Sequence, residues 1–299
     1  MKILICDKVS EKGIEILQQA PEIEVDVKLK LSEEEICEII PQYHAVVVRS
    51  QTKITKKILE EAKQLKVVGR AGVGIDNIDV ETATLKGIVV VNTPDGNTIS
   101  AAEHTLAMML ALARHIPQAD QSLREGKWNR SQFVGVELRN KTLGIIGYGK
   151  IGSEVGKRSQ AFGMKILVYD PYVNQEVAER AGVKAVSLDT LLQESDFITV
   201  HMPLTSETKH LLCAQQFAKM KEGVRILNVA RGGIIDEQAL YEAIMNKKVA
   251  GAALDVYEQE PQTASPLFEL PEVIVTPHLG ASTAEAQVNV AIDVAYEIL

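Results

Sequence analysis

A glycine-rich stretch between two short apolar runs constrains the fold of this chain more than any other feature. The first run, Leu143–Ile146, predicts a buried strand, and the segment 147–152 (Gly-Tyr-Gly-Lys-Ile-Gly) follows it directly. A helical pattern then ends near Phe162, a second run at Lys165–Tyr169 predicts another strand, and Asp170 comes next. This order of strand, glycine loop, helix, strand and acid predicts one βαβ unit of a parallel sheet.

Each glycine has its own physical role in such a unit. Gly147 makes the tight turn, Gly149 lets backbone N–H groups approach a pyrophosphate, and Gly152 lets the helix pack against the strand. The helix N-terminus adds donors and partial positive charge. Asp170 accepts hydrogen bonds from a ribose diol and repels a 2′-phosphate. The stretch therefore predicts a dinucleotide site that prefers NAD to NADP, although the motif alone also fits a turn without a ligand.

A second glycine segment, Gly69–Gly74, also follows an apolar run, but it departs from the motif. Counted from Gly72, the third glycine position is occupied by Asn77, and the later acid, Asp95, lies in a Thr-Pro-Asp-Gly turn signal. We interpret this segment as a backbone surface near the substrate rather than a second dinucleotide site.

Composition and charge exclude several classes of function. The 299 residues are enough for two domains. The net charge of −8, with no basic stripe, argues against a nucleic-acid or acidic-membrane partner. No apolar run reaches the roughly 18 residues needed to span a bilayer. The three cysteines are far apart, which favours a reduced, cytoplasmic compartment, and neither His nor Cys occurs at metal-ligand spacing.

The first part of the chain alternates short apolar runs with amphipathic stretches, which predicts a parallel sheet with helices on both faces. The expected strands are Ile3–Cys6, Glu24–Lys28, Ala45–Val48, Val67–Val68 and Val89–Val91. Ligands bind beyond the carboxyl ends of such strands. Arg49 and Arg70 each follow one of them, so both are candidates to bind an anionic substrate, the alternative being two surface arginines.

The middle of the chain predicts a buried helix and an exposed arm. Ser100–Glu103 (Ser-Ala-Ala-Glu) matches a capping box and opens an apolar helix to about Arg114. His104 on this helix fits a buried, hydrogen-bonded histidine better than a ligand or base. The polar segment 121–135 contains the single tryptophan, Trp128, and is typical of an exposed arm that contacts a second subunit.

A second alternation of strands and helices from Lys141 to about Leu279 predicts a doubly wound sheet of Rossmann type. The expected strands are Leu143–Ile146, Ile166–Tyr169, Ala185–Val186, Phe197–Val200, Val224–Asn228, Gly251–Leu254 and Val273–Val275. The last stretch, 282–299, has a helical pattern that stops without a cap, which suggests a longer parent chain.

Three polar residues follow strands of this second sheet: Arg231, Glu260 and His278. A guanidinium binds a carboxylate in a bidentate manner, an imidazole carries protons near neutral pH, and a carboxylate orients the ring and stabilises its protonated form. Together they suit hydride transfer at a carbon that bears a hydroxyl next to a carboxylate. Each also fits a surface role, and a pairing of Arg231 with Asp236 is an equal alternative. His201, at another strand end, is the competing proton donor.

Four segments resemble the NAD-dependent D-2-hydroxyacid dehydrogenases: 147–152, 228–236 (Asn-Val-Ala-Arg-Gly-Gly-Ile-Ile-Asp), 252–256 (Ala-Ala-Leu-Asp-Val) and 277–283 (Pro-His-Leu-Gly-Ala-Ser-Thr). Segments 48–52, 69–77 and 92–97 resemble the D-3-phosphoglycerate dehydrogenases within that family. The resemblance covers essentially the whole chain. Family members often carry Thr where Val73 stands and Cys where Val229 stands, at contacts made mainly by the backbone.

The resemblance implies a flavodoxin-like substrate-binding domain (1–97 and 282–299), a Rossmann NAD-binding domain (98–281) and a homodimer joined through the latter. It implies Arg231 as substrate anchor, Glu260 as histidine partner and His278 as acid/base. The implied NAD contacts are Gly147, Gly149, Lys150, Ile151, Gly152, Asp170, Met202, Val229, Ala230, Arg231, Asp255, His278, Gly280 and Ala281. The implied substrate contacts are Arg49, Val73, Gly74, Asn97, Arg231 and His278.

The reaction that the resemblance implies is the NAD-dependent oxidation of 3-phospho-D-glycerate to 3-phosphohydroxypyruvate, the first step of serine biosynthesis. Two alternatives stay open from the sequence. The chain can act on another D-2-hydroxyacid, as a glyoxylate or hydroxypyruvate reductase does, or it can be a non-catalytic NAD(H)-sensing interaction protein.

Overall fold

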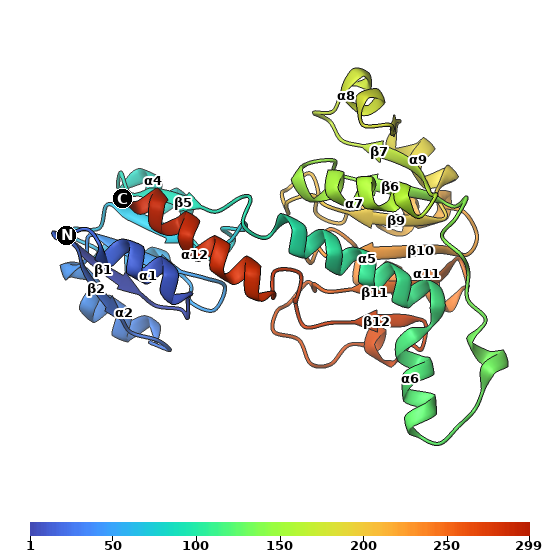
Figure 1. Ribbon diagram of the computed structural model, residues 1–299, viewed down its shortest axis with the longest axis horizontal. Helices are drawn as coiled ribbons and strands as arrows, with labels where there is room; N and C mark the ends of the chain where they lie inside the picture. Colours follow the sequence, from blue (N-terminus) through green and yellow to red (C-terminus); the bar gives the residue numbers. More distant parts are fainter. The chain divides into compact units, whose positions relative to one another are not determined.

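The computed structural model describes residues 1–299 and divides into two compact units. The smaller unit comprises Met1–Thr98 and Ala281–Leu299, and the larger unit comprises Ile99–Gly280. Each contains one parallel sheet with helices on both faces (Figure 1), so the predicted α/β class is confirmed. The division lies one residue away from each boundary implied by the resemblance.

The sheet of the smaller unit has the strand order β2-β1-β3-β4-β5, the flavodoxin-like order expected. Its strands are β1 (Lys2–Ile5), β2 (Glu24–Val27), β3 (Ala45–Val48), β4 (Val67–Arg70) and β5 (Val89–Asn92). Its helices are α1 (Glu11–Gln18), α2 (Glu33–Ile39), η1 (Ile40–Gln42), α3 (Lys56–Glu61), α4 (Val80–Leu85) and α12 (Ala284–Ile298).

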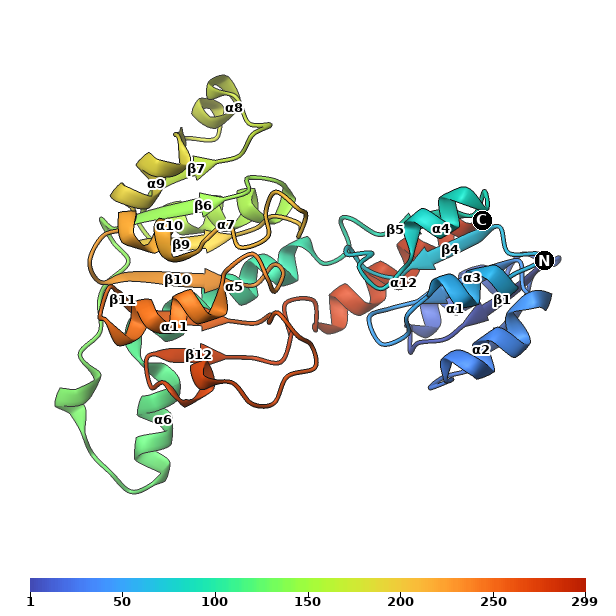
Figure 2. The same cartoon turned by 180° about the vertical axis from the view of Figure 1, so that it is seen from behind.

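The two faces of this sheet carry different helices. Helices α2, α3 and α4 cover one face, and α1 and α12 lie side by side on the other (Figures 1 and 2). Gly13 allows this pairing, because a Cβ there would lie 2.4 Å from the carbonyl oxygen of Ala291. The C-terminal helix is therefore an integral layer of a unit that is otherwise built from the first 98 residues.

The larger unit has seven strands in the order β12-β11-β10-β9-β6-β7-β8. They are β6 (Thr142–Ile146), β7 (Lys165–Tyr169), β8 (Lys184–Ala185), β9 (Phe197–Val200), β10 (Val224–Asn228), β11 (Val249–Leu254) and β12 (Val273–Val275). The helices are α5 (Thr98–Arg114), α6 (Ile116–Arg124), η2 (Arg130–Phe133), α7 (Lys150–Ala161), α8 (Gln175–Arg180), α9 (Leu188–Glu194), α10 (Ala214–Lys219), α11 (Glu237–Met245) and η3 (Pro266–Glu269).

Helices α5, α7 and α8 pack on one face of this sheet, and α9, α10 and α11 pack on the other (Figures 1 and 2). The central strands are buried on both sides, as the continuous apolar runs predict for a parallel sheet. Strand β6 pairs with β7 on one side and with β9 on the other, so the strand order reverses at β6. Because β6, β7, β9 and β10 are parallel, their carboxyl ends lie along one edge of the sheet.

The predicted capping box at Ser100–Glu103 is wrong. Helix α5 begins at Thr98, so Ser100 already lies inside the helix. Its side chain is buried, and its Oγ donates a hydrogen bond of 2.7 Å to the carbonyl oxygen of Gly280. A tertiary partner distant in sequence therefore uses the hydroxyl that the local pattern assigned to a cap.

The segment expected to be an exposed arm, 121–135, is helical at its start, because α6 (Ile116–Arg124) extends into it. Pro117 stands in the first turn of α6, after a left-handed His115 (φ 53) that separates α6 from α5. Beyond α6 the chain forms the short η2 turn, and α6 and this segment project from the larger unit in both views. Trp128 is 76% exposed, which agrees with the expected exposed character of the arm.

None of the helices combines the length and the apolar character needed to cross a bilayer. Likewise, no three His, Cys, Asp or Glu side chains gather in a geometry suited to a metal ion.

Candidate active site

Three adjacent strands present the candidate catalytic residues. In the sheet, β11 lies between β10 and β12, and all three strands are parallel. Arg231 follows β10, Glu260 lies in the loop after β11, and His278 follows β12. Because parallel strands end at the same edge, the three loops start from neighbouring positions.

The structure brings His278 and Glu260 into direct contact. The Nδ1 atom of His278 lies 2.6 Å from Oε2 of Glu260, and Oε1 of Glu260 accepts the N–H of Tyr257 at 3.0 Å. Burial opposes ionisation of Glu260, but these two bonds outweigh it and hold the pKa of the carboxyl below its ordinary value. Glu260 is therefore a carboxylate at neutral pH, and it fixes the orientation of the imidazole.

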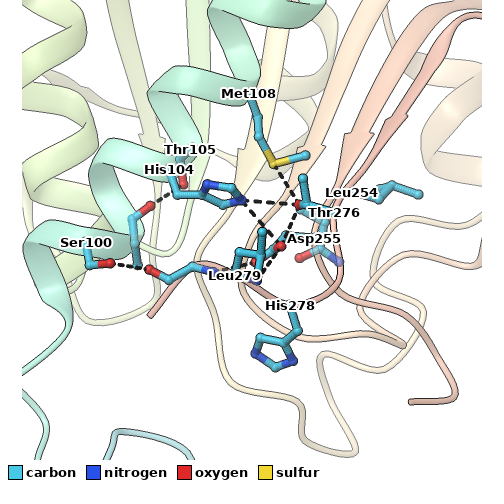
Figure 3. Close-up of polar contacts among 12 residues, drawn as sticks. Ser100, His104, Thr105, Met108, Leu254, Asp255, Thr276, His278 and Leu279 are labelled. Atoms are coloured by element: carbon cyan, nitrogen blue, oxygen red, sulfur yellow. Dashed lines mark hydrogen bonds and ion pairs between the residues drawn. The ribbon is translucent and has the colours of Figure 1, made fainter. Parts of the chain in front are cut away.

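A second, fully buried carboxylate holds the turn that carries His278. Asp255 accepts hydrogen bonds from the Thr276 hydroxyl (2.6 Å) and the N–H groups of Leu279 (2.7 Å) and Gly280 (2.8 Å). Burial opposes its ionisation, but bonds from His104, Thr276 and the two N–H groups keep its pKa below the ordinary value. Figure 3 shows the ring of His278 outside this cluster, pointing away from Asp255.

His104 belongs to this cluster. Its Nε2 lies 3.3 Å from Asp255 Oδ1 and 3.2 Å from the Thr276 hydroxyl (Figure 3). These contacts agree with the expected hydrogen-bonded histidine, but the side chain is only partly buried, with 21% of its surface exposed. Sequence reasoning did not identify Thr276 as its partner, because only the fold brings α5 next to the end of β12.

The loop that carries Arg231 is held by its own side chains and by the neighbouring loop. The Asn228 amide Nδ2 donates to the carbonyl of Arg231 at 2.9 Å, and its Oδ1 accepts the N–H of Ala230 at 3.1 Å. A Cβ on Gly232 would lie 1.7 Å from the carbonyl oxygen of Tyr257. Glycine is therefore required beside Arg231, because the Glu260 loop packs directly on the backbone there.

The glycine loop after β6 fits the phosphates of a dinucleotide. Gly147 has φ 91, and a Cβ there would lie 2.5 Å from the carbonyl oxygen of His201. A Cβ on Gly152 would lie 2.1 Å from the Gly147 carbonyl, so both glycines are sterically required. Gly149, at the N-cap of α7, has no atom within 4 Å of a Cβ position and no side-chain cap. The start of α7 thus offers N–H groups and open space to an anion.

Asp170 lies where the ribose acid is expected, at the end of β7. Its two oxygens accept N–H bonds of 2.8 Å each, one from Tyr148 in the glycine loop and one from Tyr172. A carboxylate oxygen can accept more than one bond, so both atoms retain capacity for a ribose hydroxyl. The same carboxylate therefore ties the glycine loop to the strand that carries it.

The other residues implied as NAD contacts lie at neighbouring strand ends: Lys150 and Ile151 on α7, Met202 after β9, Val229 and Ala230 after β10, and Gly280 and Ala281 after β12. His201, the competing proton donor, also follows β9. Its Nδ1 is buried without a partner, and its Nε2 lies 3.0 Å from the Thr199 hydroxyl. Burial lowers its pKa to about 4, so this ring is neutral and poorly suited to carry a proton.

The residues implied as substrate contacts in the smaller unit gather at the carboxyl edge of its sheet. Arg49 follows β3, Val73 and Gly74 follow β4, and Asn97 follows β5. The N–H of Arg49 donates to Oδ2 of the buried Asp7 at 2.6 Å. The Asn97 Oδ1 atom is buried with no hydrogen-bond partner.

Two supporting residues at this edge were not identified from the sequence. Asp7, just after β1, also accepts the N–H and hydroxyl of Thr52. The Asn77 amide donates to the carbonyls of Arg49 (2.7 Å) and Thr52 (2.6 Å). Asp7 and Asn77 therefore hold the Arg49–Thr52 turn. Asp7 follows the apolar run Ile3–Cys6, which is a sequence signal, whereas no such run adjoins Asn77.

The second glycine segment lacks the features of a dinucleotide loop. Helix α4 begins only at Val80, after an irregular stretch, so no helix N-terminus follows Gly72 and Gly74 directly. Gly69 instead allows helix packing, because a Cβ there would lie 2.8 Å from Ile298 and 2.9 Å from Val294 on α12.

Comparison with known proteins identifies the family. Residues 106–280 match the model of the D-isomer specific 2-hydroxyacid dehydrogenase, NAD binding domain. The chain belongs to this family. The predicted cofactor, NAD, and the Rossmann fold of the larger unit are thereby confirmed.

Proteins of similar sequence carry different names within this family. The D-3-phosphoglycerate dehydrogenase of Synechocystis sp. is 57% identical over 99% of this chain and 53% of its own length. The hydroxypyruvate reductase of Thermotoga maritima is 48% identical over 99% of this chain and 97% of its own length. This chain thus spans about half the length of the phosphoglycerate dehydrogenases that it matches.

Solved structures of the family have the same fold. The D-lactate dehydrogenase of Aquifex aeolicus, solved in complex with NAD and lactic acid, has a TM-score of 0.88 and 29% identity over 99% of this chain and 94% of that chain.

Proposed function

We propose that the protein catalyses the NAD-dependent oxidation of 3-phospho-D-glycerate to 3-phosphohydroxypyruvate, the first step of serine biosynthesis. One observation carries the proposal. The imidazole of His278 is bonded to the carboxylate of Glu260 at 2.6 Å, and the guanidinium of Arg231 follows β10, the strand next to the one that precedes Glu260. This set matches the needs of a 2-hydroxyacid, which has a hydroxyl proton to remove and a carboxylate to hold.

In the proposed mechanism, Arg231 binds the substrate carboxylate and His278 removes the hydroxyl proton. Because Nδ1 of His278 is bonded to Glu260, Nε2 is the atom that receives the proton. Glu260 then stabilises the imidazolium. When bound, NAD accepts the hydride that leaves C2 of the substrate. The proposed cofactor contacts are the glycine loop, Asp170 and the strand-end residues described above.

The names of several relatives and the position of Arg49 both favour a phosphorylated substrate. Several relatives that are 51–57% identical carry the name D-3-phosphoglycerate dehydrogenase. Arg49 supplies a guanidinium at a strand end, a group suited to phosphate. Val73, Gly74 and Asn97 complete the proposed substrate contacts.

Hydroxypyruvate reduction is a second candidate function. It is supported by the Thermotoga maritima relative, which this chain covers over 97% of its length. The same side chains serve this reaction, because a 2-keto acid presents a carboxylate to Arg231 and a carbonyl that accepts the proton of His278. The phosphate is the chemical difference between the two candidates.

We further propose that the protein acts as a cytoplasmic homodimer joined through the larger unit. Helix α6 and the arm expose several large apolar side chains, and exposed aromatic and apolar side chains are frequent at interfaces. These side chains are Ile116, Leu123, Trp128 and Val134. Arg130 on the same arm is a candidate to reach the substrate phosphate of the second subunit.

A substrate panel tests the proposed function directly. NADH formation is measured with 3-phosphoglycerate, glycerate, lactate and glycolate, and the reverse reaction with hydroxypyruvate and glyoxylate, each with NAD(H) and NADP(H). Fastest turnover of 3-phosphoglycerate with NAD supports the proposal. Preference for an unphosphorylated acid supports the second candidate, and absence of turnover with every acid contradicts both.

A further inference from the structure

The loops that carry Arg231 and Glu260 touch each other through their backbones. Besides the Tyr257 carbonyl, the N atom of Glu258 lies 2.8 Å from the Cβ position of Gly232. Any change in the path of one loop therefore displaces the other. The separation of the guanidinium from the His278–Glu260 pair depends on how firmly these loops are held together.

Two glutamates hold the loops by exchanging hydrogen bonds. The N–H of Glu258 donates to Oε1 of Glu237 at 2.7 Å, and the N–H of Glu237 donates to Oε1 of Glu258 at 3.3 Å. Glu237 is the first residue of α11, the helix that follows the Arg231 loop. Glu258 lies in the Glu260 loop. The exchange thus fixes the two loops at a second point beyond Gly232.

His210 adds a third connection. Its Nε2 lies 3.1 Å from Oε1 of Glu258, and its backbone N–H donates to the carbonyl of Gly233 at 2.7 Å. We call Glu237, Glu258 and His210 the loop clasp. Asp236 also faces His210, with 3.9 Å between Oδ2 and Nδ1, so the imidazole stands among carboxylates on both sides.

The clasp contributes little to the free energy of unfolding. Burial, together with the nearby Glu258 and Glu260 charges, raises the pKa of the Glu237 carboxyl despite its bond from the Glu258 N–H. Bringing like charges together costs free energy, and partly exposed pairs contribute little stability. What the arrangement does provide is a defined geometry, because each carboxylate holds the backbone of the other residue.

The clasp faces a cavity that the proposed reacting groups do not line. It borders a cavity of about 410 Å³ whose lining includes His210, Asp236, Glu237, Tyr241, Glu258 and Pro266 but none of Arg231, Glu260 and His278. Its members therefore act through the loops and not on the substrate.

We propose that Glu237, Glu258 and His210 are positioning residues that set the separation between Arg231 and the His278–Glu260 pair. This inference rests on the proposed function of that site. The reaction requires the carboxylate anchor and the base to engage adjacent carbons of one small substrate, so their separation has little tolerance. A displacement of about 1 Å is enough to cost a factor of roughly 10² in rate.

The clasp predicts different effects for alanine and glutamine. Glu258→Gln keeps an oxygen that accepts the Glu237 N–H, whereas Glu258→Ala removes it. We expect Glu258→Ala to lower kcat/KM by about 10- to 100-fold, with unchanged NADH affinity, and Glu258→Gln to restore most of the loss. Glu237→Ala should behave like Glu258→Ala, and the double variant should be no worse than either single variant, because the two residues act as one unit.

The matched control is Glu242→Ala. Glu242 lies on the same helix α11 and is exposed, and its Oε1 accepts a bond from Gln238. This variant should keep parent activity. Steady-state kinetics on the full chain with its best substrate, NADH binding by fluorescence and amide hydrogen exchange are measured for all variants. In the alanine variants, exchange should rise at residues 231–237 and 257–262.

Three outcomes would overturn the clasp, and a fourth concerns only the proposed function. Parent-like kcat/KM and exchange in Glu258→Ala would overturn the clasp, and so would equal losses in the alanine and glutamine variants. Equal losses of activity in Glu258→Ala and Glu242→Ala would indicate a general effect on the fold and would also overturn it. Absence of turnover in the parent contradicts the proposed function alone, because hydrogen exchange still tests whether the clasp holds the two loops.

Discussion

The imidazole Nδ1 of His278 lies 2.6 Å from the carboxylate Oε2 of Glu260, and His278 itself has a left-handed backbone with φ 55. Such a backbone is uncommon for a residue with a side chain and is maintained only by surrounding contacts. Here the Asp255 carboxylate supplies them by binding the N–H groups of Leu279 and Gly280. Two carboxylates therefore act on one histidine: Asp255 holds its backbone turn and Glu260 holds its ring.

Replacing His278 by asparagine should remove the base with little change to the turn, because asparagine tolerates left-handed φ. We expect turnover to fall by about 10²–10⁴-fold, the usual scale for general acid–base catalysis. NADH affinity should change little. Steady-state rates and NADH fluorescence titration measure the two quantities. Turnover within a few-fold of the parent would show that another group moves the proton.

Replacing Arg49 by alanine should separate the two candidate functions. Loss of a charged hydrogen-bond partner costs about 1.5–3 kcal/mol, or roughly 10- to 100-fold in kcat/KM. This loss should appear with 3-phosphoglycerate and be absent with lactate or glycolate. Arg180→Ala, an exposed arginine paired with Glu176, serves as the control. Equal losses with phosphorylated and unphosphorylated acids would exclude Arg49 as the phosphate ligand.

Replacing Asp170 by asparagine should weaken the preference for NAD over NADP. The substitution removes the charge that repels a 2′-phosphate, so the ratio of kcat/KM for NADP to that for NAD should rise about tenfold, equivalent to about 1.4 kcal/mol. NAD affinity should also fall, because the carboxylate binds the Tyr148 N–H in the glycine loop. The ratio, and not either rate alone, is therefore the quantity to measure. An unchanged ratio would assign cofactor choice to other residues.

Most of the architecture follows from the sequence, because periodic apolar runs report burial directly. The strands at Ala45–Val48, Phe197–Val200, Val224–Asn228 and Val273–Val275 have the expected bounds. The glycine loop was predictable for a steric reason: at Gly147 and Gly152 a side chain would overlap backbone atoms. The motif is contiguous in the sequence, so it can be recognised before the tertiary contacts that require its glycines are known.

The wrong or missing predictions occur where the local sequence pattern does not determine the structure. The capping box at Ser100 failed because the Gly280 carbonyl uses the hydroxyl. Helix α6 was not predicted, because its composition is polar and only the left-handed His115 separates it from α5. In the site, the order of Arg231, Glu260 and His278 along strand ends was predictable. The contacts of Asp255 with His104, and of Glu258 with Glu237, were not, because they depend on how the loops fold back.

His201 predicts a specific dependence of stability on pH. Its pKa is lowered to about 4 by burial, whereas a histidine in an unfolded chain titrates near 6.5. Between these values the unfolded state binds the proton and the folded state does not. The free energy of unfolding should therefore be insensitive to His201 above about pH 7 and should fall as the pH drops from about 6.5 towards 4. At pH 5 the expected loss is about 2 kcal/mol.

His201→Gln tests this expectation, because the amide can still bond the Thr199 hydroxyl and does not titrate. The parent and the variant are unfolded in urea at pH 8 and at pH 5, and circular dichroism follows the transition. The parent should lose about 2 kcal/mol more than the variant between the two pH values. Carboxylates and the other histidines titrate in both proteins and cancel in this comparison. Equal losses would mean that the buried ring accepts its proton in the folded state, which would restore His201 as a rival proton carrier.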